Sequence, residues 1–97
     1  MRGFLMDNIE KDLSKIGIFG DFSKGKNNSI VLDLEDSDAF GKMFSLFDRT
    51  SEVELQEDTL IMNTHTANIN YEYKNYLITL TADFDADNYK LIVKEKN

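Results

Sequence analysis

The sequence predicts an α+β protein in which two helices pack on one face of a mainly antiparallel sheet of five to six strands, in the order α-β-α-β-β-β-β-β. Two segments in the first half of the chain have apolar residues at helical spacing. After residue 50, apolar and polar residues alternate almost to the last residue, as they do in strands with one buried face and one wet face. At 97 residues, the chain is expected to form a single domain over residues 1–97.

The first helix is expected over residues 7–16. Asp7 and Glu10 fit a capping box, in which an N-cap Asp is followed three residues later by a Glu. Apolar residues recur at near-helical spacing along this segment: Leu5, Ile9, Leu13 and Ile16. Gly17 fits the left-handed residue that ends many helices. We expect residues 1–5 to form a disordered N-terminal appendage.

A loop, a strand and the second helix follow. Residues 20–29 are rich in turn-forming residues, and residues 29–34 alternate like a strand. The second helix is expected over residues 37–48, because its apolar residues fall at i, i+3, i+4 and i+7: Phe40, Met43, Phe44 and Phe47. This stripe is expected to pack against the sheet, with Leu46 exposed beside it. A close backbone approach would explain Gly41.

The remaining chain is expected to be antiparallel sheet. Turns are expected at Glu57-Asp58, at Lys74-Asn75 and within residues 83–88, where Asn and Asp favour turns. The predicted strands between these turns cover residues 52–56, 59–63, 65–74, 76–84 and 89–94.

Two segments partly match ligand-binding motifs. Asp83, Asp85 and Asp87 have the spacing of the first ligands of a calcium loop, but Lys94 occupies the position of the required bidentate Glu. We therefore interpret this segment as a hairpin turn and keep a weak calcium site as an alternative. Residues 20–27 approach a phosphate-binding P-loop, but Asn27 replaces the hydroxyl residue and the segment runs into a strand rather than a helix.

The sequence contains few residues of the types that carry out catalysis. This favours a protein that is not an enzyme and needs no cofactor. The chain has no Cys and a single His, His65, which is expected to be partly buried or at a sheet edge without a catalytic role. No nucleophile motif or pair of carboxylates held in a pocket is evident.

Acidic residues are concentrated in one block. The net charge of the chain is −7, and residues 33–58 alone carry nine acidic and two basic residues. A block of this kind repels nucleic acid and attracts basic surfaces. Its simplest role is to solvate the surface; its alternative role is to bind a partner through eight side chains: Glu35, Asp36, Asp38, Asp48, Glu52, Glu54, Glu57 and Asp58.

These observations lead to one main functional hypothesis and two alternatives. We expect a small acidic protein-binding module that binds, and in doing so inhibits, a basic partner such as a nucleic-acid-binding protein. The alternatives are a subunit that associates with itself through a sheet edge or through a wet face bearing Leu77 and Ile92, and the weak calcium module. The absence of a signal peptide or long apolar segment favours the cytoplasm and no membrane contact. The Lys-, Asn- and Asp-rich composition is typical of accessory proteins from phages and mobile elements.

Overall fold

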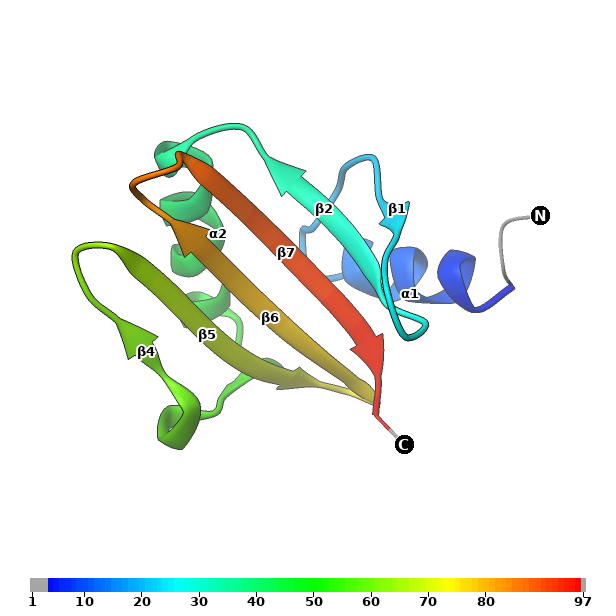
Figure 1. Ribbon diagram of the computed structural model, residues 1–97. Helices are drawn as coiled ribbons and strands as arrows, with labels where there is room; N and C mark the ends of the chain where they lie inside the picture. The colour runs from blue at the N-terminus through cyan, green and yellow to red at the C-terminus, as the bar shows by residue number, and fades with distance from the viewer. Residues whose placement is uncertain (1–3, 97) are drawn as a thin grey trace.

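The computed structural model describes residues 4–96 and confirms the α+β fold class (Figure 1). The described strands form one seven-stranded antiparallel sheet in the order β1-β2-β7-β6-β5-β3, and β4 also pairs with β5. Both helices lie on the same face of this sheet. In chain order, the elements are α1 (Phe4–Ser14), β1 (Ser23–Lys24), β2 (Ile30–Leu34), α2 (Ser37–Arg49), β3 (Glu54–Leu55), the 3₁₀ helix η1 (Glu57–Thr59), β4 (Ile61–Met62), β5 (Thr66–Tyr73), β6 (Tyr76–Asp83) and β7 (Asn88–Glu95).

The first helix begins earlier than predicted. Asp7 lies inside α1, so it is not the N-cap residue, because the helix-favouring residues before it continue the helix back to Phe4. Of the predicted N-terminal appendage, residues 4 and 5 belong to α1 and residues 1–3 lie outside the described residues. The terminating role of Gly17 is confirmed by its φ of 92°. The Ile18 N–H donates to the Leu13 carbonyl at 3.1 Å, which is the bond of a Schellman motif.

The second helix forms at the predicted position. Its N-cap is Asp36, whose carboxylate accepts a hydrogen bond from the Ala39 N–H at 2.9 Å. Phe40 and Phe47 are buried, and the Phe47 ring centroid lies 4.6 Å from that of Tyr71 on β5. These contacts attach α2 to the centre of the sheet.

Three expectations for α2 are wrong. Phe44 is 37% exposed, whereas Leu46 is partly buried against the core. The helix is therefore rotated about its axis, with Phe44 at the margin of the buried stripe and Leu46 inside it. Gly41 faces open space, since no atom lies within 4 Å of the position that a Cβ would occupy. Close backbone approach does not explain this glycine.

The three long strands β5, β6 and β7 form the centre of the sheet as an antiparallel meander. Their residues alternate between a covered face against the helices and an open face. The β5–β6 turn occurs at Lys74-Asn75 as predicted, but the positive φ of 52° belongs to Lys74 rather than to Asn75. The strand β2 pairs with β7 and thereby joins the first half of the chain to the meander.

The sheet edges are shorter than predicted. The predicted strands 52–56 and 59–63 are reduced to the two-residue strands β3 and β4, because the segment between them forms η1 instead of a tight turn. Both pair with the outer side of β5. At the opposite edge, the predicted loop contains β1, which pairs with β2. Neither described helix has the length and apolarity that a bilayer crossing requires.

Candidate interaction surface

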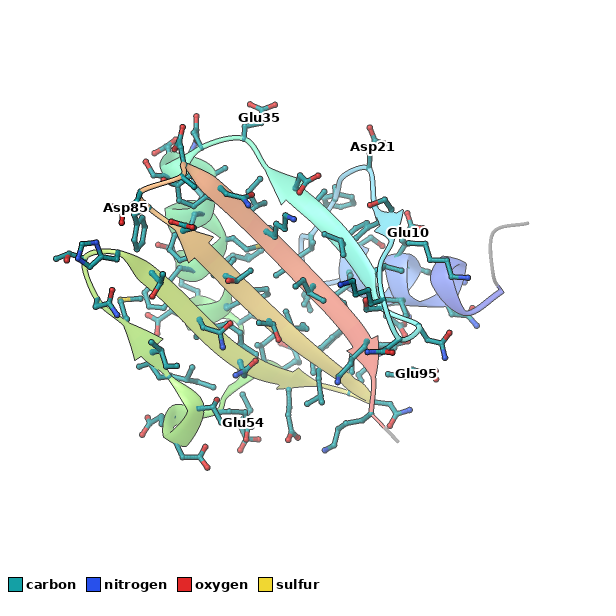
Figure 2. All side chains as sticks on the ribbon, viewed as in Figure 1. Glu10, Asp21, Glu35, Glu54, Asp85 and Glu95 are labelled. Atoms are coloured by element: carbon teal, nitrogen blue, oxygen red, sulfur yellow. The ribbon has the colours of Figure 1, made fainter. Side chains whose placement is uncertain are left out.

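The eight acidic residues of the predicted binding surface form two separate groups. The length of α2, about 18–20 Å for thirteen residues, separates them. Figure 2 labels one member of each group, Glu35 and Glu54, and shows these two far apart, at opposite edges of the sheet. The first group, at the beginning of α2, consists of Glu35, Asp36 and Asp38. The second, which we name the edge group, consists of Asp48, Glu52, Glu54, Glu57 and Asp58.

Two members of the first group serve the local structure. The Asp36 carboxylate caps α2, and the Asp38 carboxylate lies 3.2 Å from the Lys42 ammonium one turn further along. The acidic β6–β7 turn lies at the same end of the sheet, beyond Tyr89. Burial of Tyr89, followed by the nearby Asp87 carboxylate, raises the pKa of the Tyr89 hydroxyl. This end of the molecule is acidic, but its carboxylates are partly engaged.

The β6–β7 turn is the predicted hairpin turn between two strands. Its residue Asp83 accepts a hydrogen bond from the Ala86 N–H at 3.1 Å, and Asp87 has a φ of 53°. The third aspartate, Asp85, lies 2.9 Å from Nδ1 of His65. His65 precedes β5 and is exposed, so the expectation of partial burial is wrong. Among the described residues, no group of three or more His, Asp or Glu side chains is arranged to hold a metal ion.

The edge group lies beside large apolar side chains that are unusually exposed. The exposed fractions are 43% for Leu60, 54% for Ile61 and 51% for Met62, and Leu55 and Phe44 are each 37% exposed. We name this surface the edge patch; it comprises the edge group together with Phe44, Leu55, Leu60, Ile61 and Met62.

The strand register gives the edge patch its dimensions. Leu55 of β3 is paired with Tyr71, and Met62 of β4 is paired with Ala67, four residues away on β5. At about 3.3 Å per residue, the patch extends roughly 13 Å along the edge of the sheet. It is therefore wide enough to contact several side chains of another protein.

A small hollow marks the end of the edge patch nearest α2. Its volume is about 130 Å³, and Phe44, Asp48 and Leu55 form part of its wall around Tyr71. Burial, followed by the Asp48 carboxylate, raises the pKa of the Tyr71 hydroxyl to about 12. The hollow therefore places an apolar wall next to a negative charge.

The carboxylates of the edge group are not neutralised by the protein. Within the described part of the chain, none of the five forms an ion pair with a Lys or Arg. Glu52 accepts a hydrogen bond from the Ser51 hydroxyl at 3.3 Å. Arg49, the nearest base in sequence, lines a groove along another side of α2, together with Ser45 and Lys42. Negative charge at the edge patch is thus available to a partner.

Basic side chains gather along β7 on the open face of the sheet. Leu77 and Ile92 lie on this face as predicted, and Lys90 and Lys94 lie on either side of Ile92 along β7. A shallow hollow of about 440 Å³ is lined by Lys26, Lys90 and Lys94 above Val31 and Ile92. We name this surface the lysine hollow. Lys26 comes from the segment that resembles a P-loop, which here connects α1 to β2 through β1.

Sequence reasoning identified the acidic half of the edge patch and missed its apolar half. Phe44 belongs to a helical stripe that looks like core, and residues 59–63 resemble an ordinary strand. The run Leu60-Ile61-Met62 is the one signal that was available, since three consecutive large apolar residues cannot all face the same side of a strand.

Comparison with known proteins finds no matching family, no similar curated protein and no similar solved structure. The functional argument therefore depends on the geometry and charge of the surfaces described above.

Proposed function

We propose that this protein is a non-enzymatic protein-binding module whose edge patch docks a basic and partly apolar surface of a partner protein. The observation that carries this proposal is the combination of five unneutralised carboxylates with five exposed large apolar side chains on one edge of the sheet. Large apolar side chains exposed together along one edge are typical of protein–protein contacts, and surrounding charge gives such contacts their selectivity.

The charge of the edge patch selects the class of partner. Lysine- or arginine-rich surfaces are attracted to the edge group, and such attraction accelerates association at low ionic strength. A nucleic-acid-binding protein has such a surface, because it must neutralise phosphates. Carboxylates of the edge group would occupy that surface in place of phosphates, so binding would inhibit the partner.

Docking through side chains is favoured over the addition of a partner strand. A strand that joins a sheet needs a continuous row of unpaired backbone groups, whereas β3 and β4 have two residues each and η1 interrupts them. Short edge strands of this kind are a common protection against edge-to-edge pairing. The contact is therefore expected to depend on Leu55, Ile61 and their neighbours.

Charge reversal in the edge group tests the proposal. The variant Glu54→Lys/Glu57→Lys and the wild type would each be used as bait in host lysate at 50 and 500 mM NaCl. A partner captured by the wild type at low salt should be lost from the variant and weakened at high salt. The matched control is Asp21→Lys/Glu35→Lys, which makes the same charge change beside β1 and β2, at the opposite edge of the sheet.

The control also defines the contradicting result. If the captured protein binds Glu54→Lys/Glu57→Lys as well as the wild type, the edge patch is not the binding surface. Capture that is lost from Asp21→Lys/Glu35→Lys would instead assign the contact to the opposite edge of the sheet, beside β1 and β2. Circular dichroism of both variants, which change only exposed residues, checks that each remains folded.

Self-association is a second candidate function, favoured by the lysine hollow. A symmetric dimer through the edge patch would bring like carboxylates together, which is unfavourable. A head-to-tail contact would instead place the edge patch of one copy on the lysine hollow of the next. Sedimentation velocity over a range of concentrations at 50 mM NaCl tests this contact, and a monomer throughout contradicts it. Lys90→Glu/Lys94→Glu should abolish any assembly of this type.

A further inference from the structure

A cleft separates α2 from the loop that follows α1. Its volume is about 600 Å³, which lies within the range of small-molecule sites. The floor consists of apolar side chains of β2 and α2: Leu32, Leu34, Met43 and Leu46. The cleft lies on the covered side of the sheet and does not include any residue of the edge patch.

The loop at the cleft is shaped by two glycines. Gly17 ends α1 with a positive φ, and a Cβ at Gly20 would lie 2.5 Å from the Leu32 Cδ1 atom. The loop that follows α1 can therefore lie directly on β2. The cleft remains open between this loop and α2. Phe19, between the two glycines, is 72% exposed and lines the cleft.

The rim of the cleft is negatively charged. Asp21 and Glu35 line it, and neither of them forms an ion pair with the described residues. The single base at the rim, Lys42, already lies 3.2 Å from the Asp38 carboxylate. Asp21 and Glu35 both project from the upper rim of the molecule in Figure 2. The electrostatic preference of the cleft is therefore for a cation.

We propose that this cleft is a binding site for a small organic cation, namely an amine with an aromatic or aliphatic body. The body would lie on Leu32, Leu34 and Met43, and the ammonium group would face the rim carboxylates. The exposed Phe19 ring would cover the bound molecule and offer its face to the cation. This proposal is independent of the edge patch, which lies on another side of α2 and shares no residue with the cleft.

Three probes that differ mainly in charge test the site. Titrations with 2-phenylethylamine, 2-phenylethanol and 3-phenylpropionate would be followed by ¹H–¹⁵N correlation spectra at low salt. The amine should shift signals of residues 17–21, 32–35 and 39–46 in a saturable way. The alcohol should bind several-fold more weakly and the carboxylate should not bind. Equal shifts with all three probes, or shifts confined to residues outside the cleft, would overturn the proposal.

Two variants and one control complete the test. Glu35→Gln should weaken amine binding about two- to fivefold, as expected for one exposed ion pair, and leave alcohol binding unchanged. Ala39→Leu should reduce the binding of both probes, because Ala39 lines the cleft and a larger side chain fills it. Glu57→Gln removes the same charge from the edge patch and should have no effect. Amine binding that is insensitive to Glu35→Gln contradicts the assignment even if Ala39→Leu disturbs the fold.

Discussion

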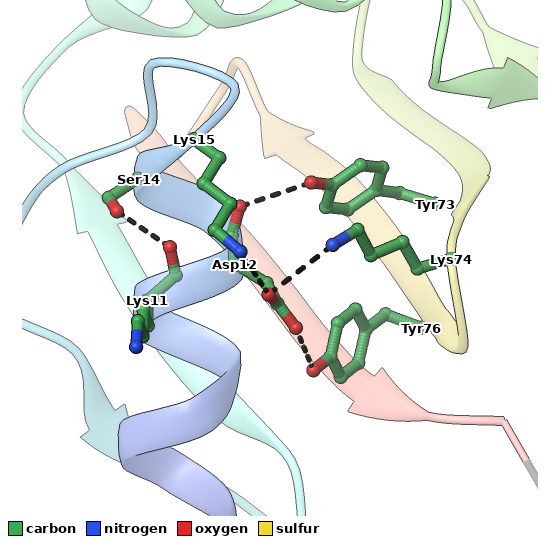
Figure 3. A network of polar contacts seen from close by, with 7 residues as sticks. All are labelled: Lys11, Asp12, Ser14, Lys15, Tyr73, Lys74 and Tyr76. Atoms are coloured by element: carbon green, nitrogen blue, oxygen red, sulfur yellow. Dashed lines mark hydrogen bonds and ion pairs between the residues drawn. The ribbon is translucent and has the colours of Figure 1, made fainter.

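At the residue scale, Asp12 forms the best-defined polar network of the protein (Figure 3). Its carboxylate accepts a hydrogen bond from the Tyr76 hydroxyl at 2.6 Å, and its main-chain carbonyl accepts one from the Tyr73 hydroxyl at 3.2 Å. The ammonium groups of Lys74 and Lys15 lie 3.5 and 3.6 Å from the same carboxylate. The network attaches α1 to the β5–β6 hairpin, from which it is distant in sequence.

Substitution of Asp12 should therefore weaken the packing of α1. The Tyr76 hydrogen bond, with smaller contributions from the two lysines, holds the pKa of the Asp12 carboxyl below its ordinary value. Asp12→Asn should lower the free energy of unfolding by about 1–3 kcal/mol at pH 7, measured by urea unfolding. Because the folded-state pKa is the lower one, the stabilisation is present above about pH 4 and is lost as the pH falls through the folded-state pKa. If the wild type remained more stable than Asp12→Asn by the same free energy at pH 2, the ionised Asp12 carboxylate would not be the source of the stabilisation.

Buried tyrosines predict a loss of stability at alkaline pH. Burial raises the pKa of Tyr71 to about 12 and also raises the pKa values of Tyr76 and Tyr89. Since their protons are held more tightly in the folded state, stability is complete below about pH 10 and decreases above it. Tyrosinate absorbance should therefore develop at higher pH in the folded protein than in the protein unfolded in urea. Coincident titrations would contradict the prediction.

At the element scale, replacement of the exposed Gly41 in α2 by alanine should stabilise the protein. Gly41 lies in the middle of the helix, and a Cβ there meets no atom within 4 Å. Gly41→Ala should raise the free energy of unfolding by about 0.5–1 kcal/mol, because alanine restricts the unfolded chain and favours the helix. The matched control is Gly20→Ala, which should be destabilising because its Cβ would collide with Leu32. Thermal or urea unfolding of the two variants should change in opposite directions.

The two phenylalanines at the end of α2 should differ in their effects. Phe47 is 2% exposed and packs on Tyr71, so Phe47→Ala should cost about 3–5 kcal/mol. Phe44, three residues earlier, is substantially exposed, and Phe44→Ala should cost well below half as much while weakening partner capture through the edge patch. Urea unfolding measures the first effect and the capture assay measures the second. Equal losses of stability would mean that Phe44 is a core residue.

At the scale of the whole molecule, uneven charge should make stability depend on salt. The net charge is −7, and the edge group contributes five carboxylates within eleven residues. Their mutual repulsion is screened by ions, so raising NaCl from 10 to 150 mM should increase the free energy of unfolding by about 0.5 kcal/mol or less. Glu54→Gln/Glu57→Gln should reduce this increase. A decrease in stability with salt would indicate that favourable ion pairs dominate instead.

The sequence predicts the centre of this fold better than its edges. In β5, β6 and β7, eight-residue alternation determines both the strand and its buried face, and the cap at Asp36 fixes the start of α2. A two-residue strand such as β1 has no pattern of its own and exists through its pairing with β2. The acidic block looks like one surface in the sequence because its residues are close together along the chain, whereas the helix within it divides them in space. The cleft was not predicted, because it depends on where a loop and a helix come to lie.

The pairing of β2 with β7 has a consequence for protein synthesis. A nascent chain emerging from the ribosome exposes Ile30 and Leu32 long before their neighbours Val93 and Leu91 have been made. The helices can form early, but the sheet cannot fold cooperatively before β7, the last strand of the meander, has been made. Cooperative folding is therefore expected only after β7 has left the ribosome. Prematurely terminated chains that lack β7 should be unfolded and rapidly degraded.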